Sequence, residues 1–164
     1  MTTPITFSEA AQLYARNAAI VDAMYRAYRD EILGFWQSVF DHLKELEPGW
    51  KLHGDPGKGG WFQFLRPTSR KNSPYFALDS WESPEVITHG QIRLYAALEN
   101  AKEEEKVALR GMASLPGCSE GKGGTHDLFR INLKIEPGTT AREIAEKIIE
   151  FSGKMQTAVE SVAS

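Results

Sequence analysis

Glycine and lysine form the same tetrapeptide, Gly-Lys-Gly-Gly, at residues 57–60 and again at residues 121–124. Glycines allow backbone N–H groups to approach an anion, and the lysine adds a positive charge, so each copy has the chemistry of a phosphate site. A Walker loop would continue with Ser or Thr and a helix, and neither copy does so. Glycine also serves ordinary turns, and the sequence favours two hairpin connections with solvated lysines. Phosphate binding stays open as the alternative.

Basic and aromatic residues are interleaved between Lys51 and Lys71, where five cationic side chains stand against Asp55 alone. Bases stack on aromatic rings and phosphates pair with cations, so this segment has the chemistry of a single-stranded nucleic-acid site. The residues that would bind phosphate or nucleic acid are Lys58, Arg66, Arg70, Lys71 and Lys122. The interpretation we favour is a core strand with inward-facing aromatics and a charged turn after it. A net charge of -3 and a pI of 5.8 give nucleic-acid binding no support.

Acidic residues near the predicted strands raise the possibility of a magnesium-dependent nuclease. Asp79 lies late in one predicted strand, and Glu99 follows the next one. Two acids and a lysine around Mg²⁺ would supply that chemistry. However, Lys102 comes three residues after Glu99, whereas the nuclease core shows an acid, one residue and then a lysine. The spacing makes a nuclease the least favoured function.

Histidine and cysteine give no catalytic or metal-binding pattern. The four histidines are His42, His53, His89 and His126, and no two have the i, i+4 spacing of a helical zinc site. Cys118 is the only cysteine, so the chain has no intrachain disulfide and no thiolate zinc site. We therefore predict no catalytic residue, no metal and no cofactor, and the balance is against an enzyme.

The N-terminal third of the chain is predicted to be one long helix, from Ser8 to about Glu47. The Ser8 hydroxyl can accept a backbone N–H at the first turn, and Pro48-Gly49 ends the helix. About forty residues at 1.5 Å each give a rod of roughly 60 Å. Such a rod is longer than a domain of this size, so it must project or bend. Gly34 is the only residue inside it that favours a bend.

Apolar residues recur along this helix at heptad spacing and form one seam. The two rows are Ala11, Ala18, Tyr25, Ile32, Val39 and Leu46, and Phe7, Tyr14, Val21, Tyr28 and Phe35. The second half of the helix is wider in its apolar face and is expected to pack on the body of the domain. The first half is then free to pair with a partner or a second copy through Tyr14, Ala18, Val21, Tyr25 and Tyr28.

The middle of the chain, residues 54–136, is predicted to be an antiparallel sheet of about four strands. The strands are expected at 61–67, 75–81, 86–98 and 127–135. The third run is ambiguous, because it shows both alternation and helical spacing, but β-branched residues and Gly90 favour a strand. In the fourth run apolar and polar residues alternate strictly, which indicates one buried and one wet face.

Two further helices are predicted after the third strand. The first is a short exposed helix at 100–113, followed by a glycine-rich loop at 114–126. The second runs over residues 139–162, where Thr140 and Glu143 can form a capping box. The chain is therefore expected to be a single α+β domain over residues 1–164, with its N-terminal and C-terminal helices on one face of the sheet.

Composition is that of a globular protein, with 164 residues of which 41% are hydrophobic. The N-terminus lacks a signal peptide, and no apolar run is long enough to span a membrane. We expect a cytoplasmic protein without membrane contact. The leading hypothesis is a non-enzymatic regulator, adaptor or inhibitor that forms a homodimer or binds a protein partner through a coiled coil of the long helix. Nucleotide or nucleic-acid binding is the second hypothesis.

Overall fold

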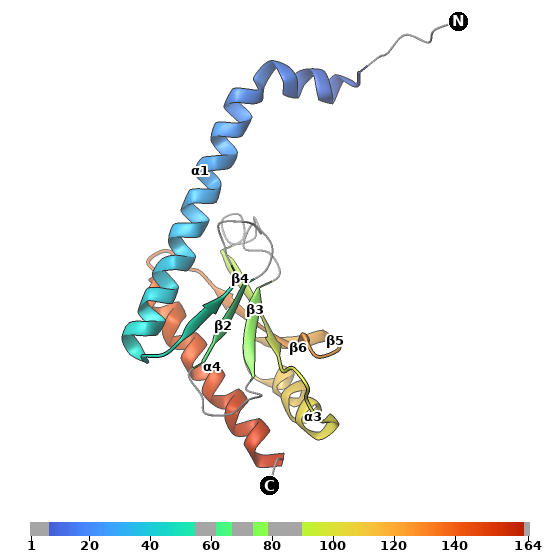
Figure 1. Ribbon diagram of the computed structural model, residues 1–164, viewed down its shortest axis with the longest axis vertical. Helices are drawn as coiled ribbons and strands as arrows, with labels where there is room; N and C mark the ends of the chain where they lie inside the picture. Colours follow the sequence, from blue (N-terminus) through green and yellow to red (C-terminus); the bar gives the residue numbers. More distant parts are fainter. Residues whose placement is uncertain (1–6, 55–61, 67–73, 79–89, 163–164) are drawn as a thin grey trace, which may run out of the picture.

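The computed structural model of the protein describes residues 7–54, 62–66, 74–78 and 90–162 (Figure 1). Its first element is the helix α1 (Glu9–Leu46), which confirms the long N-terminal helix. The Ser8 side chain caps the first turn by accepting the N–H of Ala11 at 3.2 Å. At the other end, the N–H of Glu47 donates to the carbonyl of Leu43 and the extended backbone that follows stops the helix.

Six antiparallel strands form one sheet, and they confirm the α+β fold class. The strands are β1 (Lys51–His53), β2 (Phe62–Leu65), β3 (Tyr75–Leu78), β4 (Gln91–Ala97), β5 (Cys118–Gly123) and β6 (Asp127–Lys134). Their order in the sheet is β1-β2-β3-β4-β6-β5. The ambiguous run at 86–98 is a strand over 91–97, as predicted, while residues 86–89 lie outside the described part of the chain.

The expectation of about four strands was too low, because β1 and β5 were not predicted. β1 has only three residues and lies at a sheet edge, so it carries no apolar alternation. β5 falls in the segment that its glycines marked as a loop, yet it pairs with β6 from Cys118 to Gly123 with a register shift. Gly121 is needed there, since a Cβ atom would come within 2.0 Å of the Asp127 carbonyl oxygen.

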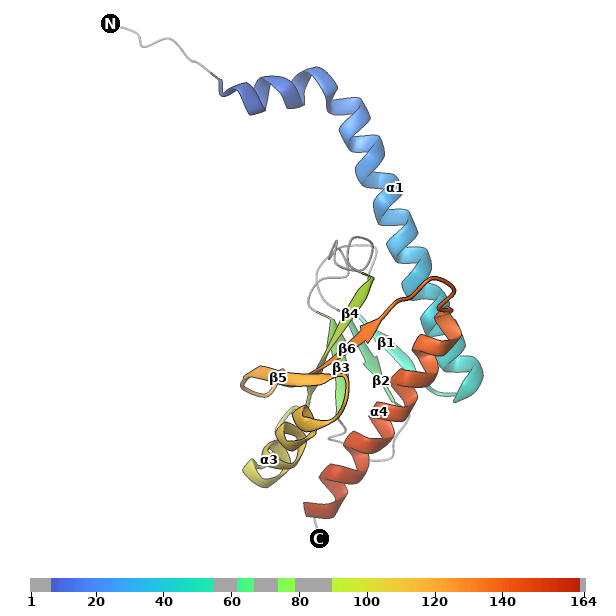
Figure 2. The same ribbon diagram turned by 180° about the vertical axis from the view of Figure 1, so that it is seen from behind.

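The helices lie on one face of this sheet and enclose the main core (Figure 2). α3 (Glu103–Gly111) and α4 (Ala141–Val162) confirm the two later helices. Thr140 and Glu143 form the predicted capping box, with backbone-to-side-chain bonds of 2.7 Å and 3.2 Å. The C-terminal half of α1 packs beside α4, and its buried residues are Ile32, Trp36, Val39 and Leu43.

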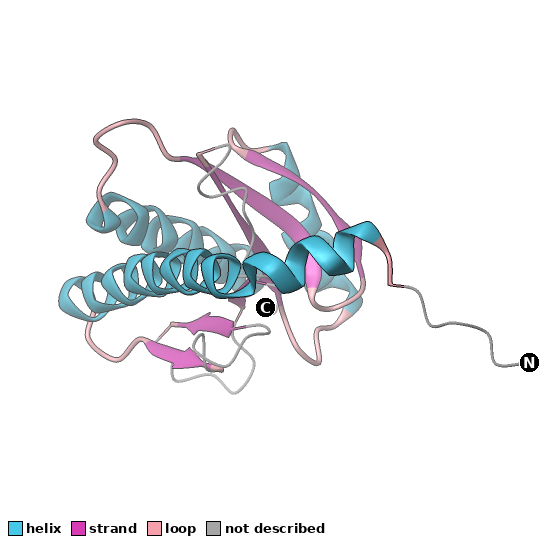
Figure 3. Ribbon diagram, turned by 90° about the horizontal axis from the view of Figure 1, so that it is seen from above, coloured by secondary structure: helices cyan, strands magenta, loops and turns pink. Residues whose placement is uncertain are grey.

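The N-terminal half of α1 leaves this body and projects beyond it (Figure 1). It also bends near its N-terminal end, and the views from the front and from above show the first turns leaning toward the side of α1 on which the body lies (Figures 1 and 3). The expected rod therefore both projects and bends.

Glu47 fastens the end of α1 to the sheet. One carboxylate oxygen accepts Nε and Nη2 of Arg66, at 3.2 Å and 2.9 Å, and the other accepts Nε1 of Trp50 at 2.8 Å. Trp50 is buried, and the Glu47–Arg66 pair is about one quarter exposed. The three bonds connect the helix end, the segment before β1 and the end of β2.

Replacing Glu47 with Ala is therefore expected to lower the free energy of unfolding by about 1–2 kcal/mol, since charged hydrogen bonds are lost at a partly solvated site. Urea denaturation followed by circular dichroism measures the change. Glu31→Ala, an exposed change on the same helix, is the matched control and should leave stability within about 0.5 kcal/mol of the parent. Equal losses in the two variants would contradict the role given to Glu47.

Candidate functional site

Exposed apolar side chains are concentrated on the N-terminal half of α1. In the described part of the chain, every exposed large apolar residue except Val107 and Val162 lies between residues 7 and 25. Among these apolar residues, the most exposed on α1 are Leu13, Ile20 and Met24, at 64%, 63% and 68%. We define the α1 stripe as Leu13, Tyr14, Ile20, Val21, Met24 and Tyr25, and Phe7 lies just before it. Water contact with so much contiguous apolar surface is typical of an interaction site.

The α1 stripe occupies one side of the helix. At 100° per residue its six members fall within an arc of about 140°. Eighteen residues make five full turns, so positions 18 apart lie on the same side of a helix. Tyr14, Val21 and Tyr25 stand 18 residues before the buried Ile32, Val39 and Leu43, respectively. Tyr14, Val21 and Tyr25 thus continue the core-facing side of α1 beyond the core, and Leu13, Ile20 and Met24 widen this surface on one flank.

Two polar contacts accompany the bend in α1. The side-chain amide of Asn17 donates to the Leu13 carbonyl at 2.9 Å. This bond competes with the backbone N–H of the helix for the same carbonyl oxygen. The Tyr14 hydroxyl donates to Asp22 at 3.0 Å, across eight residues that span about 12 Å of a straight helix. This hydrogen bond and the Asp22 charge raise the pKa of Tyr14. The bend lies before Gly34, so glycine is not its cause, contrary to expectation.

The predicted partner-binding residues are all on this part of α1. Tyr14, Val21 and Tyr25 are exposed, while Ala18 and Tyr28 are half-buried. The sequence interpretation missed Leu13, Ile20 and Met24, which extend the stripe on one flank. Their spacing of seven and four residues is a helical signal that was present in the sequence but lay outside the two rows considered.

The predicted phosphate-binding residues do not form one cluster in the described structure. Lys58, Arg70 and Lys71 lie outside the described residues. Arg66 follows β2 and pairs with Glu47, whereas Lys122 is in β5 at the far edge of the sheet. Three strands separate β2 from β5, which places these two strands about 19 Å apart. A single phosphate group cannot contact both.

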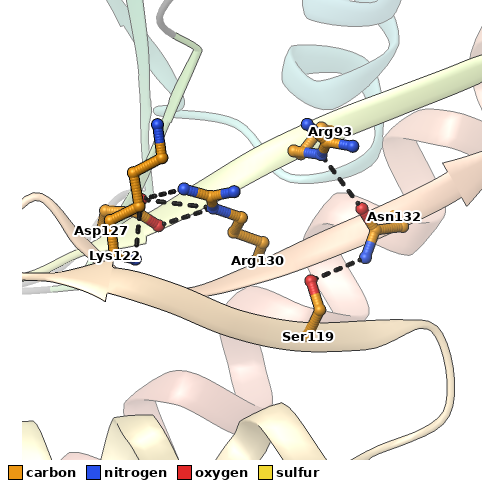
Figure 4. Close-up of polar contacts among 6 residues, drawn as sticks. All are labelled: Arg93, Ser119, Lys122, Asp127, Arg130 and Asn132. Atoms are coloured by element: carbon orange, nitrogen blue, oxygen red, sulfur yellow. Dashed lines mark hydrogen bonds and ion pairs between the residues drawn. The ribbon is translucent and has the colours of Figure 1, made fainter.

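The second Gly-Lys-Gly-Gly copy is part of the β5–β6 hairpin, and a carboxylate of the same hairpin accepts a hydrogen bond from its backbone (Figure 4). The N–H of Lys122 donates to Asp127 at 3.0 Å, and Nε of Arg130 donates to the same carboxylate at 3.0 Å. Burial alone would raise the pKa of Asp127, but these bonds outweigh it and lower that pKa. A carboxylate therefore sits where a phosphate would meet this backbone N–H.

The second face of the sheet, opposite the helices, carries arginine and tyrosine. The Arg130 guanidinium lies 5.0 Å from the centre of the Tyr95 ring. Beside it, Nε of Arg93 donates to Asn132, whose amide donates in turn to the Ser119 hydroxyl at 3.0 Å (Figure 4). Both arginines are engaged by internal acceptors, so their charge is already partly satisfied.

Tyr75 joins an acid and a histidine at one end of that face. Its hydroxyl lies 3.3 Å from Glu99 and 3.4 Å from Nδ1 of His126, and the residue is 6% exposed. Burial, followed by the charge of Glu99 and its hydrogen bond, raises the pKa of Tyr75 to about 12. A phenol that holds its proton so firmly is a poor general acid or base near neutral pH.

Tyr75 is expected to ionise after most of the other tyrosines in an alkaline titration followed by absorbance at 295 nm. The folded pKa lies above the ordinary value near 10, so its contribution to stability is complete below about pH 10 and is lost as pH rises toward 12. Tyr75→Phe should remove the late step, and Tyr14→Phe, which removes a second tyrosine whose pKa is raised, should keep it. A late step that survives Tyr75→Phe would contradict the assignment.

The described residues also bear on metal binding, membrane insertion and nucleophilic chemistry. They contain no group of three or more His, Cys, Asp or Glu side chains that could hold a metal ion. Within the described ranges, no helix is long and apolar enough to cross a membrane. Cys118 is half-buried, and burial raises the pKa of its thiol, which makes the thiol a weak nucleophile. Of the nuclease residues, Asp79 is outside the described residues and Glu99 contacts Tyr75.

Comparison of the chain with protein-family models, with curated proteins and with solved structures finds no match. Function is therefore inferred from the geometry of the chain itself.

Proposed function

We propose that this protein is a non-enzymatic interaction or regulatory protein, of adaptor or inhibitor type, that self-associates or binds a protein partner through the α1 stripe. One observation carries the proposal: the core-facing side of α1 continues for five turns beyond the core, with its large apolar residues exposed. Since the single Cys118 leaves no intrachain disulfide, we place this activity in the cytoplasm.

The available apolar surface is sufficient for a specific contact. Fully burying a large apolar side chain stabilises by about 1.5–3 kcal/mol, so residues that are roughly half exposed contribute about 1 kcal/mol each. The six residues of the α1 stripe and Phe7 would together contribute roughly 7 kcal/mol before the entropy of association is subtracted. When two copies associate both stripes are buried, so the gross gain is about 14 kcal/mol, and subtracting an association cost of about 4–15 kcal/mol leaves a reversible association in the micromolar range or weaker.

Size-exclusion chromatography with light scattering, over a range of protein concentrations, tests the proposal. A mass near twice 18.3 kDa, rising with concentration, is expected for self-association. If the protein stays at 18.3 kDa, an α1 peptide of residues 7–27 immobilised on beads is the probe for a protein partner. A monomer whose peptide captures no more protein than a peptide with Val21→Glu would overturn the proposal.

Nucleotide or nucleic-acid binding through the Gly-Lys-Gly-Gly segments and the basic 51–71 segment is the second candidate. The Arg130–Tyr95 pair on the second face of the sheet favours it, because cations and aromatic rings together suit nucleic acid. Lys58→Ala with Lys122→Ala is then expected to weaken binding of a labelled single strand. The slope of log K against log salt should fall by about 0.7 for each phosphate that the variant no longer neutralises. No binding by the parent protein in fluorescence anisotropy would exclude this candidate.

A further inference from the structure

We propose that the free edge of β6 binds an extended peptide of a protein partner, with an acidic residue between two apolar residues. This is a second interaction surface, on the body of the protein and independent of the α1 stripe. It arises because β6 is longer than its neighbour. β5 begins at Cys118, opposite Ile131, and the Gly117 carbonyl accepts the N–H of Asn132 at 2.7 Å. In the described part of the chain, no strand flanks the rest of β6 on this side.

The backbone of Lys134 faces this free edge. In an antiparallel sheet, the N–H and C=O of successive residues point to opposite sides of the strand. The N–H of Ile135 donates to the Gly90 carbonyl on the β4 side at 2.6 Å, whereas Asn132 faces β5. Lys134 therefore faces away from β4, and within the described ranges its N–H and C=O have no backbone partner. Strand addition by a peptide uses such a pair of groups.

A groove lies beside this edge, between α4 and the end of β6 (Figure 2). We call it the β6 groove. Its volume is about 950 Å³, and its apolar lining residues include Leu115, Leu133, Ile144 and Phe151. This volume is at the upper end of the range for ligand pockets, so the side chains of a short peptide can enter it.

The alternation of side chains along β6 determines the pattern of the peptide. Lys134 stands opposite Gln91, on the second face of the sheet. A peptide residue paired with Lys134 would place its side chain on the same face, about 5 Å away between Cβ atoms. Lys134 is exposed and has no ion-pair partner among the described residues, so an acidic side chain fits there. The residues before and after it would point to the other face, into the β6 groove.

The charges on the α4 wall of the β6 groove are already engaged within the chain. Glu150 accepts hydrogen bonds from Lys147 at 3.0 Å and Lys154 at 2.7 Å. Glu146 pairs with Arg142, and Glu143 belongs to the capping box. The wall therefore leaves the apolar lining as its main attraction, which favours apolar residues on both sides of the acidic one.

Two labelled peptides of seven residues test the pattern by fluorescence anisotropy. Gly-Ser-Val-Glu-Val-Ser-Gly is the probe, and Gly-Ser-Val-Lys-Val-Ser-Gly is its matched control. The parent protein should bind the control about tenfold more weakly, since it places like charges opposite each other. Lys134→Glu should reverse this preference. Lys44→Glu, the same change at an exposed lysine of α1, should leave both affinities unchanged.

Amide hydrogen exchange followed by NMR locates the contact. In the free protein the Lys134 amide should exchange faster than those of Asn132 and Ile135, which are hydrogen-bonded. The glutamate peptide should slow exchange at Lys134 and change the other two little.

Several outcomes would overturn the proposal without affecting the α1 stripe, which light scattering tests separately. One is an absence of binding by the parent protein up to about 1 mM peptide. Others are equal affinity for the two peptides, a preference that survives Lys134→Glu, or slow exchange at Lys134 in the free protein. If that exchange slowed with protein concentration and no peptide, a second copy would occupy the edge instead.

Discussion

The double variant Val21→Glu, Met24→Glu is expected to be a monomer at concentrations where the parent protein forms the proposed dimer. Both positions lie within the α1 stripe, and both side chains are exposed in the single chain, so the fold itself should tolerate the change. In the dimer each glutamate would become a buried, unpaired charge, which costs about 3 kcal/mol or more. The dissociation constant should therefore rise at least about 100-fold. Light scattering gives the mass, and far-ultraviolet circular dichroism checks that α1 remains helical.

Ala19→Glu is the matched control for this prediction. Ala19 is exposed on the same helix, but it lies about 180° from the middle of the α1 stripe. The substitution introduces the same type of charged side chain on the opposite side of the helix, so it should leave the parent mass unchanged. If Ala19→Glu dissociated the dimer as strongly as the double variant, net charge rather than the stripe would govern the association.

Trp36→Ala is expected to produce the largest loss of stability. Trp36 is 2% exposed, and its ring lies 4.9 Å from that of Phe35 and 5.9 Å from that of Phe64, measured between ring centres. Phe64 belongs to β2, so this contact joins α1 to the sheet. Truncating a buried tryptophan removes apolar contacts and leaves a cavity, and the expected loss is about 3–5 kcal/mol of unfolding free energy.

Urea denaturation measures this loss, and Arg26→Ala is the control. Arg26 is an exposed residue on the projecting half of α1, so its truncation should change the unfolding free energy by no more than about 0.5 kcal/mol. A change below about 1 kcal/mol for Trp36→Ala would show that the helix does not pack on the sheet as described.

Local signals in the sequence were sufficient for the helices. Ser8, the heptad rows and Pro48 predicted the bounds of α1 to within a residue or two, and Thr140 with Glu143 predicted the start of α4. These signals act within a few residues of one another. The sheet was harder to predict from the sequence, because β1 is too short to show a hydrophobic pattern and β5 is held by pairing with β6 despite its glycines.

The candidate site was predicted in part. The two apolar rows identified Tyr14 and Val21, but Leu13, Ile20 and Met24 were not included, although they are exposed along one edge of the same surface. The bend could not be foreseen from glycine or proline. It involves the Asn17 amide and a Tyr14–Asp22 contact, and neither residue pair forms a recognised helix-breaking signal. The contact of Arg66 with Glu47 joins residues 19 apart in the sequence, and hydrophobic periodicity does not predict such a contact.

One side of α1 is an exposed surface in the N-terminal half and a core surface in the C-terminal half. The number of residues between the two halves therefore fixes the direction of the exposed surface relative to the body. A single residue inserted between Tyr28 and Ile32 would turn everything before it by about 100° and point the stripe away from the side that the body occupies. Seven inserted residues would turn it by only about 20° and lengthen the arm instead. Insertions and deletions in this linking turn thus keep the stripe in place only when their length is close to a whole number of turns, such as about 7, 11 or 18 residues, whatever residues they contain.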